Sequence, residues 1–125
     1  LFRSVPSPEI AEEICAEIEA TKAFDPDVTV TISGGMNRPP YTKDDGIEAL
    51  YQKARVLAEE IGFELEDMST GGGSDGNFTA ALGIPTLDGL GVDGAGAHQL
   101  DEHMYYSSLV PRTRLLLRLL ETLEA

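Results

Sequence analysis

A glycine-rich turn, Gly71 to Asp75, follows a segment expected to be a strand and precedes a segment expected to be a short helix. Glycines allow a ligand to approach the backbone closely, and the backbone amides of such a turn, with the helix N-terminus, can receive an anion. The lysine and the spacing of a nucleotide-binding P-loop are missing. The turn is therefore a candidate anion site, although a tight turn that needs positive φ would have the same composition.

The same turn reads Gly-x-Ser-x-Gly around Ser74, which matches the nucleophile elbow of serine hydrolases. An acid, Asp88 or Asp93, and then His98 follow in the order that such enzymes use. They follow within about 25 residues, however, whereas that fold spreads its triad over several βα units. A serine hydrolase that uses Ser74 is the alternative enzymatic interpretation, and a non-enzymatic anion-binding module is a second alternative.

His98 closes a glycine-rich segment that begins at Gly89, and this segment offers little bulk to bury an imidazole. Neutral imidazole is a common zinc ligand, so the composition around His98 favours a metal-binding role. His103 follows five residues later. That spacing is not specific to a metal site, and we expect His103 to be a surface residue.

Several segments share an order and spacing that are typical of one enzyme family. They are Thr70-Gly71-Gly72-Gly73-Ser74-Asp75, Gly89-Leu90-Gly91, Gly94-x-Gly96-x-His98, Glu102 and, upstream, Asn37-Arg38-Pro39-Pro40. The pattern resembles the zinc metallopeptidases that include glutamate carboxypeptidase, acetylornithine deacetylase and succinyl-diaminopimelate desuccinylase. The resemblance covers the whole chain and is closest from 69 to 103.

The resemblance implies a hydrolase with two zinc ions per active site that cuts an amide next to a free carboxylate, in a small peptide or an N-acyl amino acid. His98 matches the histidine that binds one zinc. Arg38 matches the arginine that holds the substrate carboxylate, which suits a guanidinium because it can donate two parallel hydrogen bonds. The loop lining this pocket corresponds to Gly72, Gly73 and Ser74. Arg3, on the strand before the lid helix, is a further substrate-binding candidate.

The family's other metal ligands are not identifiable in this chain. They are a His-x-Asp pair, a bridging aspartate and two adjacent glutamates, one of them the general base. The pairs Glu12-Glu13 and Glu59-Glu60 lie on amphipathic helices and are expected to face solvent. A catalytic zinc needs about three protein ligands. We therefore expect the C-terminal part of an enzyme, with no catalytic residue of its own, at most weakly bound zinc and no activity by itself.

The elements that would position these residues alternate between strand and helix. Apolar and polar periodicities predict strands over 1–5, 28–33, 63–68 and 84–87. Apolar stripes predict helices over 8–22, 47–61, 77–82 and 108–124. The first helix is expected to begin at Ser7-Pro8, and Gly62 and Gly83 are expected to end the second and the third.

This alternation from residue 41 onward predicts an α/β layered sheet. Together with the resemblance, it gives the C-terminal half of a three-layer zinc-peptidase catalytic domain (41–125), preceded by part of an α+β, ferredoxin-like lid or dimerisation domain (1–33). Residues 34–40 break both periodicities and form the predicted hinge. We expect His98 near the 71–75 loop on one rim of the sheet. We also expect a homodimer through the lid domain. Strand 1–5 is expected to pair with another chain or a swapped element, which would also cover the apolar faces of helices 8–22 and 108–124.

The composition narrows the partners and the compartment. Acidic residues outnumber basic ones by 22 to 9, and the net charge of −13 argues against nucleic acid. The longest apolar runs, such as Leu115 to Leu117, are far too short to span a membrane. A single cysteine, Cys15, cannot form a disulfide within the chain, so a cytoplasmic location is expected. Residue 1 is Leu rather than Met, and we expect further sequence upstream.

Overall fold

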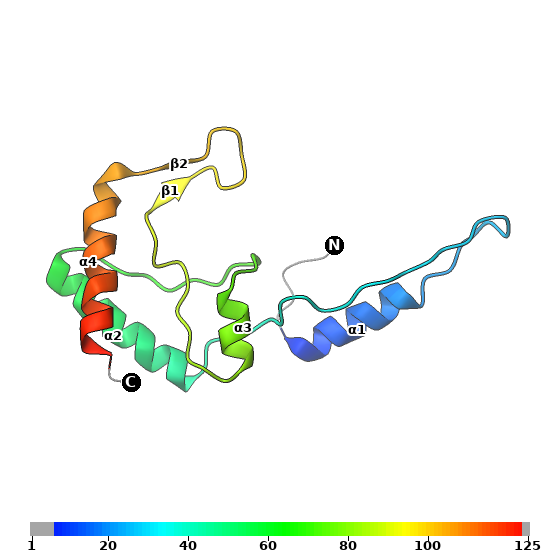
Figure 1. The fold of residues 1–125 in the computed structure, drawn as a ribbon, viewed down its shortest axis with the longest axis horizontal. Helices are drawn as coiled ribbons and strands as arrows, with labels where there is room; N and C mark the ends of the chain where they lie inside the picture. The colour runs from blue at the N-terminus through cyan, green and yellow to red at the C-terminus, as the bar shows by residue number, and fades with distance from the viewer. Residues whose placement is uncertain (1–6, 124–125) are drawn as a thin grey trace. The chain divides into compact units, whose positions relative to one another are not determined.

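The computed structural model describes residues 7–123 of the chain, and the regular secondary structure in that range is mostly helical (Figure 1). The elements, in order, are α1 (Pro8–Glu19), α2 (Asp45–Ile61), α3 (Gly76–Ala81), β1 (Gly94–Ala95), β2 (His103–Met104) and α4 (Tyr106–Thr122). The strand predicted over 1–5 lies outside the described residues. No helix in the described range is long and apolar enough to cross a membrane.

The chain divides into two compact units. Unit 1 consists of residues through Asp44 together with Ser69–Thr86, and unit 2 consists of Asp45–Met68 together with residues from Leu87 onward. The glycine-rich loop therefore belongs to the same unit as Arg38, whereas His98 belongs to the other. The predicted lid, hinge and catalytic domain, 1–33, 34–40 and 41–125, remain a prediction.

Helix α1 begins where the sequence predicts. The Ser7 hydroxyl accepts a hydrogen bond from the amide of Ile10 at 3.4 Å, and Pro8 occupies the first turn, where its missing N–H is not needed. The helix ends at Glu19, before the predicted residue 22. Its predicted apolar stripe is only partly covered, because Ala11 is buried while Ile10 and Ile18 are both 40% exposed.

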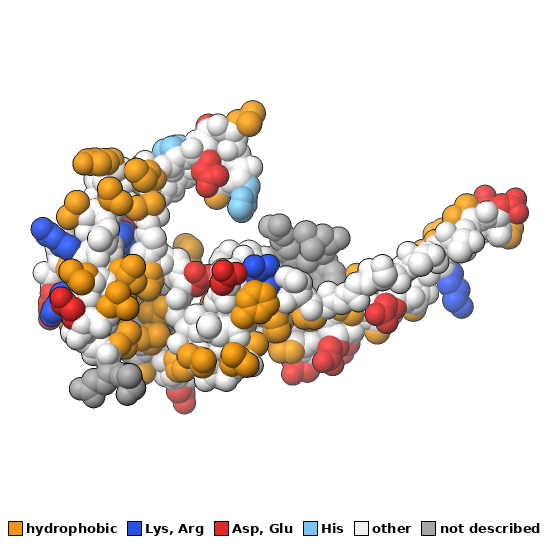
Figure 2. Space-filling model, in the orientation of Figure 1, with side chains coloured by type: hydrophobic (Ala, Val, Ile, Leu, Met, Phe, Trp, Pro, Cys, Tyr) orange, Lys and Arg blue, Asp and Glu red, His pale blue; other side chains and the backbone are white. Residues whose placement is uncertain are grey.

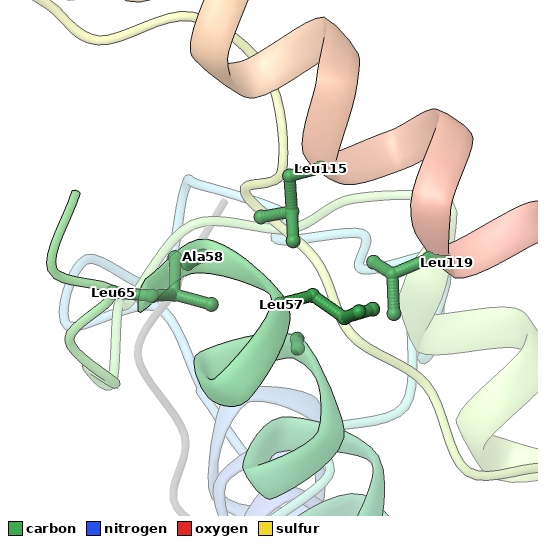
Figure 3. Close-up of a cluster of buried hydrophobic side chains, with 6 residues drawn as sticks. Leu57, Ala58, Leu65, Leu115 and Leu119 are labelled. Carbon is green, nitrogen blue, oxygen red and sulfur yellow. The ribbon is translucent and has the colours of Figure 1, made fainter. Parts of the chain in front are cut away.

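Unit 2 has an apolar core between α2 and α4 (Figure 3). The predicted α2 stripe is confirmed, and Gly62 at φ +102° ends the helix with its amide bonded to the carbonyl of Ala58. The residues buried in this core are Ala54, Leu57, Ala58, Leu65, Leu115 and Leu119. Partly buried Tyr51, Ile61, Phe63, Leu87 and Leu90 pack around them.

The predicted strands over 28–33, 63–68 and 84–87 do not form, and this part of the fold prediction is wrong. The sheet of the described region is a two-stranded antiparallel one, with Gly94 opposite Met104 and Ala95 opposite His103. Alternation of apolar and polar residues favours an extended backbone, but a strand also needs a neighbour to accept and donate its backbone hydrogen bonds. The three segments lack such a neighbour within the described residues.

Helix α4 is less covered than its wide apolar arc predicts. Leu115 and Leu119 point into the core, but other apolar side chains remain exposed, and Figure 2 shows hydrophobic side chains gathered over this helix. The exposed large apolar residues of α4 are Tyr106, Leu109, Val110, Leu116, Leu117 and Leu120. A helix with apolar residues over so wide an arc normally has a second partner.

Candidate functional site

In unit 1 the structure brings Arg38 onto the glycine-rich loop. Its Nε donates to the carbonyl of Ser74 at 3.0 Å, and its NH2 group forms an ion pair with Asp75 Oδ1 at 3.0 Å. The guanidinium also stacks over the ring of Phe78, 5.0 Å from the ring centre. A cation is therefore held in a fixed orientation at a loop 36 residues away in the sequence.

Gly73 makes this approach possible. A Cβ atom added to Gly73 would lie 3.1 Å from Cδ of Arg38, which is tighter than ordinary van der Waals contact. The side chain of Arg38 is still 40% exposed, and that of Asp75 is 92% exposed. The guanidinium is therefore open to solvent, and its carboxylate partner is a surface group whose ion pair is screened by water.

Asn77, which was not among the candidate residues from the sequence, connects the loop to the segment that carries Arg38. Its side-chain oxygen accepts from the amide of Ser74 at 2.9 Å, and its side-chain nitrogen donates to the carbonyl of Pro39 at 2.8 Å. Asn77 is only 9% exposed, so both bonds are largely protected from water. An asparagine at the start of a short helix was the only signal in the sequence.

The loop amides are less available to an anion than the sequence suggests. The amide of Gly72 donates to the Thr70 hydroxyl at 3.2 Å, and the amide of Ser74 is used by Asn77. The amide of Gly76 donates to the Ser74 hydroxyl at 3.1 Å. Three of the amides that would form the predicted anion site already have side-chain partners. The positive charge of this site is supplied by Arg38.

The backbone at Ser74 is not that of a nucleophile elbow. Such an elbow holds its serine in a strained turn between a strand and a helix. Among the described residues, His98 is the only non-glycine residue with positive φ, and Ser74 is therefore not in the left-handed region. Its hydroxyl accepts from the amide of Gly76, as in an ordinary turn stabilised by serine.

In unit 2, His98 lies in the connection between β1 and β2, with φ of 65°. Positive φ is uncommon for residues other than glycine, although histidine is among the types that adopt it most often, and strained backbone positions cluster at functional sites. The amide of His98 donates to Glu102 Oε2 at 3.3 Å, which ties the two ends of the turn together. The side chain is exposed and therefore open to a ligand.

The glycine at position 94 is required by the hairpin. A Cβ atom there would lie 2.2 Å from the carbonyl oxygen of His103, a distance that no side chain tolerates. The Gly94-x-Gly96-x-His98 pattern is thus partly a structural requirement for the close approach of the two strands. The same hairpin that needs the glycine also presents His98.

His103 lies on β2, and its Nδ1 is 2.7 Å from the carbonyl oxygen of Asp101. A carbonyl oxygen can only accept, so Nδ1 is the donor in this contact. His103 is exposed, as predicted. Within residues 7–123 no three histidine, cysteine, aspartate or glutamate side chains converge in a way that could hold a metal ion. The described residues therefore do not supply a complete set of metal ligands by themselves.

Of the remaining predictions from the sequence, one is confirmed and two are not tested. Glu12, Glu13, Glu59 and Glu60 are exposed, as expected. Arg3 lies outside the described residues. The expected proximity of His98 to the 71–75 loop remains a prediction, since the two lie in different units.

Comparison with known proteins places the chain among peptidases. Residues 4–122 match the sequence profile of the peptidase family M20/M25/M40. The chain belongs to this family. The succinyl-diaminopimelate desuccinylase of Paracidovorax citrulli is 34% identical over 99 residues, which cover 79% of this chain and 24% of the relative. Carboxypeptidase G2 of Pseudomonas sp. (strain RS-16) is 33% identical over 87 residues, which cover 69% of this chain and 20% of that protein.

A third relative extends over nearly the whole chain. The succinyl-diaminopimelate desuccinylase of Albidiferax ferrireducens is 28% identical over 126 residues, covering 99% of this chain and 30% of the relative. This chain therefore spans less than a third of the length of these curated relatives. No solved structure matches the chain significantly.

Members of the M20 family typically depend on zinc. The hairpin of unit 2 fits one part of a zinc site, because an exposed imidazole is presented in a constrained conformation. It does not fit a whole site, because the described residues provide no convergent set of three donors.

Proposed function

We propose that the chain is the C-terminal part of a zinc-dependent amidohydrolase of the M20 family, which cleaves an amide bond next to a free carboxylate. The observation that carries this proposal is the exposed guanidinium of Arg38, fixed by Ser74 and Phe78 beside the glycine-rich loop. Its partner Asp75 is a carboxylate that is almost fully exposed. A substrate carboxylate would take the place of Asp75 on the guanidinium.

The proposed substrate is a small peptide or an N-acyl amino acid. Two observations support this class. The relatives are named as a desuccinylase and a carboxypeptidase, and Arg38 offers donors that match the planar geometry of a carboxylate. Gly73 would leave room for the substrate beside Arg38, because it has no side chain. Gly72 and Ser74 would line the same pocket.

In the proposed mechanism Arg38 binds and orients the substrate, so that the scissile amide is held in a productive position. His98 would contribute one imidazole to a site with two zinc ions. Zinc would supply the nucleophile for hydrolysis and polarise the scissile carbonyl. We assign the general base and the remaining ligands to a part of the enzyme outside this chain, and for this reason we propose that the chain alone is inactive.

The apolar faces of α1 and α4 are partly exposed in this chain. We propose that they are covered in the complete enzyme, and that the enzyme is a homodimer formed through the lid domain. This is consistent with a chain that spans less than a third of the length of its relatives and leaves Leu116, Leu117 and Leu120 on α4 exposed.

The proposed location of the enzyme is the cytoplasm, as expected from the single cysteine, Cys15.

Two substitutions in the complete enzyme separate zinc hydrolysis from serine hydrolysis. We expect His98→Ala to abolish amide hydrolysis and to lower the zinc content measured by metal analysis, with the fold intact. Ser74→Ala should retain substantial activity. The reverse ranking would contradict the zinc assignment and support the serine nucleophile. Retention of ligand binding and no sensitivity to chelators would instead support the non-enzymatic anion-binding module.

A further inference from the structure

The hairpin that carries His98 is anchored to the start of α4 by hydrogen bonds at its base. Asp93 immediately precedes β1, and Tyr105 immediately follows β2. The amide of Tyr105 donates to the carbonyl of Asp93 at 2.8 Å, which closes the base. Ser108, on the first turn of α4, bonds to both sides: its Oγ accepts from the amide of Asp93 at 2.9 Å and donates to the carbonyl of Tyr105 at 2.7 Å.

An ion pair reinforces this attachment one turn further along α4. Arg112 donates through NH2 to Asp93 Oδ1. The Arg112 side chain is only 15% exposed, and its guanidinium stacks over Phe63, 5.3 Å from the ring centre. Phe63 in turn packs against the α2–α4 core. The base of the hairpin is thus connected through a partly buried arginine to the apolar core of unit 2.

We infer that Asp93, Ser108 and Arg112 form a clamp that positions His98 for metal binding. The hairpin has only two residues in each strand, and a two-stranded sheet of this size is not stable by itself. The direction in which it presents His98 must therefore be set by its attachment to α4. Asp93, Ser108 and Arg112 are positioning residues, since none of them is a ligand in the proposed site. The inference rests on the proposed function, which assigns His98 as a zinc ligand.

A purely structural alternative is that these residues only stabilise the start of α4. Tyr105, the residue that caps this helix, makes no capping bond through its side chain, and Ser108 bonds to the Tyr105 carbonyl. Such a role would affect the stability of α4. It would not change zinc affinity, and it would not make the hairpin amides exchange faster than those of the core. The two interpretations therefore differ in what happens to the hairpin when the core of unit 2 is intact.

The test uses Arg112→Met in the complete enzyme, with Arg112→Lys as the conservative variant. Arg118→Met is the matched control, because Arg118 lies on the same helix and pairs with the exposed Glu121 at 3.2 Å. Zinc affinity is measured by chelator competition, and amide hydrogen exchange is measured on the metal-free enzyme. Values of kcat and KM are determined with an N-acyl amino acid. Ser108→Ala is a second variant that keeps the proposal testable where Arg112→Met fails to fold.

We expect Arg112→Met to weaken zinc binding by about 10-fold, as is typical when an outer contact that orients a ligand is lost. Amides of the hairpin should exchange faster, while those of Leu57 and Leu119 in the core stay protected. The kcat should fall with little change in KM, because Arg38 binds the carboxylate. Arg112→Lys should restore part of the zinc affinity, and Arg118→Met should resemble the original enzyme.

Unchanged zinc affinity and hairpin exchange in both Arg112→Met and Ser108→Ala would overturn the clamp. Equal loss of protection in the hairpin and in the core would also overturn it, because it would show a general stabilising role. A failure of the proposed function is recognised separately: His98→Ala would then bind zinc as tightly as the original enzyme. In that case the exchange experiment would still report whether the clamp holds the hairpin.

Discussion

The contacts inside unit 1 differ in kind from the contacts inside unit 2. In unit 2 the residues between α2 and α4 form an apolar core in which Leu115 is fully buried. In the described part of unit 1, Ala11 is the only buried apolar residue, and the Arg38 site is joined by hydrogen bonds from Asn77 and by the ion pair to Asp75. A site organised by polar contacts can exchange a partner for a substrate, whereas a packed core cannot.

The largest expected effect is the loss of the apolar core of unit 2. Leu115→Ala should destabilise unit 2 by about 2–5 kcal/mol, because it removes a fully buried side chain and leaves a cavity. Hydrogen exchange of the α2 and α4 amides measures this loss. Leu116→Ala is the control, since Leu116 is 46% exposed, and it should have a much smaller effect. Equal effects of the two substitutions would show that the α2–α4 contact is not the main source of stability.

An intermediate effect is expected at the polar connection of unit 1. Asn77→Ala should loosen the loop by about 1–3 kcal/mol, because it leaves the Ser74 amide and the Pro39 carbonyl without their partner. Asn77→Asp keeps an acceptor for the Ser74 amide but loses the donor to Pro39. Its loop stability should therefore fall between that of the original enzyme and that of Asn77→Ala. Hydrogen exchange at Ser74 measures the change. If Asn77→Ala lowers the protection of the α2 and α4 amides as much as that of the Ser74 amide, the two units are not independent in stability.

The smallest expected effect concerns the start of α1. A hydrogen bond from the backbone N–H of Glu9, and then one from Ser7, lower the pKa of the Glu9 carboxyl below its ordinary value of 4.5. The ionised group therefore stabilises the helix start above pH 4.5, and this contribution is lost as the pH falls through the lowered pKa. Exchange of the α1 amides should become faster in that range. Glu9→Gln should remove this pH dependence, and an unchanged pH profile in the variant would contradict the assignment.

Local signals in the sequence were enough to predict the helices. Ser7 caps α1, Gly62 ends α2, and Gly83 at φ +75° follows the short helix α3, as their residue types indicate. These contacts join residues only a few positions apart. The strands predicted over 28–33, 63–68 and 84–87 failed because alternation does not specify a pairing partner.

The candidate site was predictable only in part for the same reason. The pairing of Arg38 with the glycine-rich loop followed from the family resemblance, and the structure brings these residues together within unit 1. Asn77 and the attachment of Asp93 to Arg112 depend on contacts between distant parts of the sequence. Ordinary polar and charged residues carry no pattern that reveals such partners. The glycine-rich composition near His98 predicted a loop there, but not the pairing of β1 with β2.

The most direct test of the central claim is whether Arg38 recognises a substrate carboxylate. The measurement is kcat/KM of the complete enzyme and its Arg38→Met variant, with an N-acyl amino acid and with the same compound carrying a neutral C-terminal amide. Arg55→Met serves as a control for the loss of a surface charge, since Arg55 is an exposed residue that pairs with Glu59 at 3.9 Å. We predict that Arg38→Met lowers kcat/KM for the free acid by roughly 10- to 100-fold and leaves that for the amide nearly unchanged. Equal losses for both compounds, or no loss for the acid, would contradict the assignment of Arg38 as the carboxylate-binding residue.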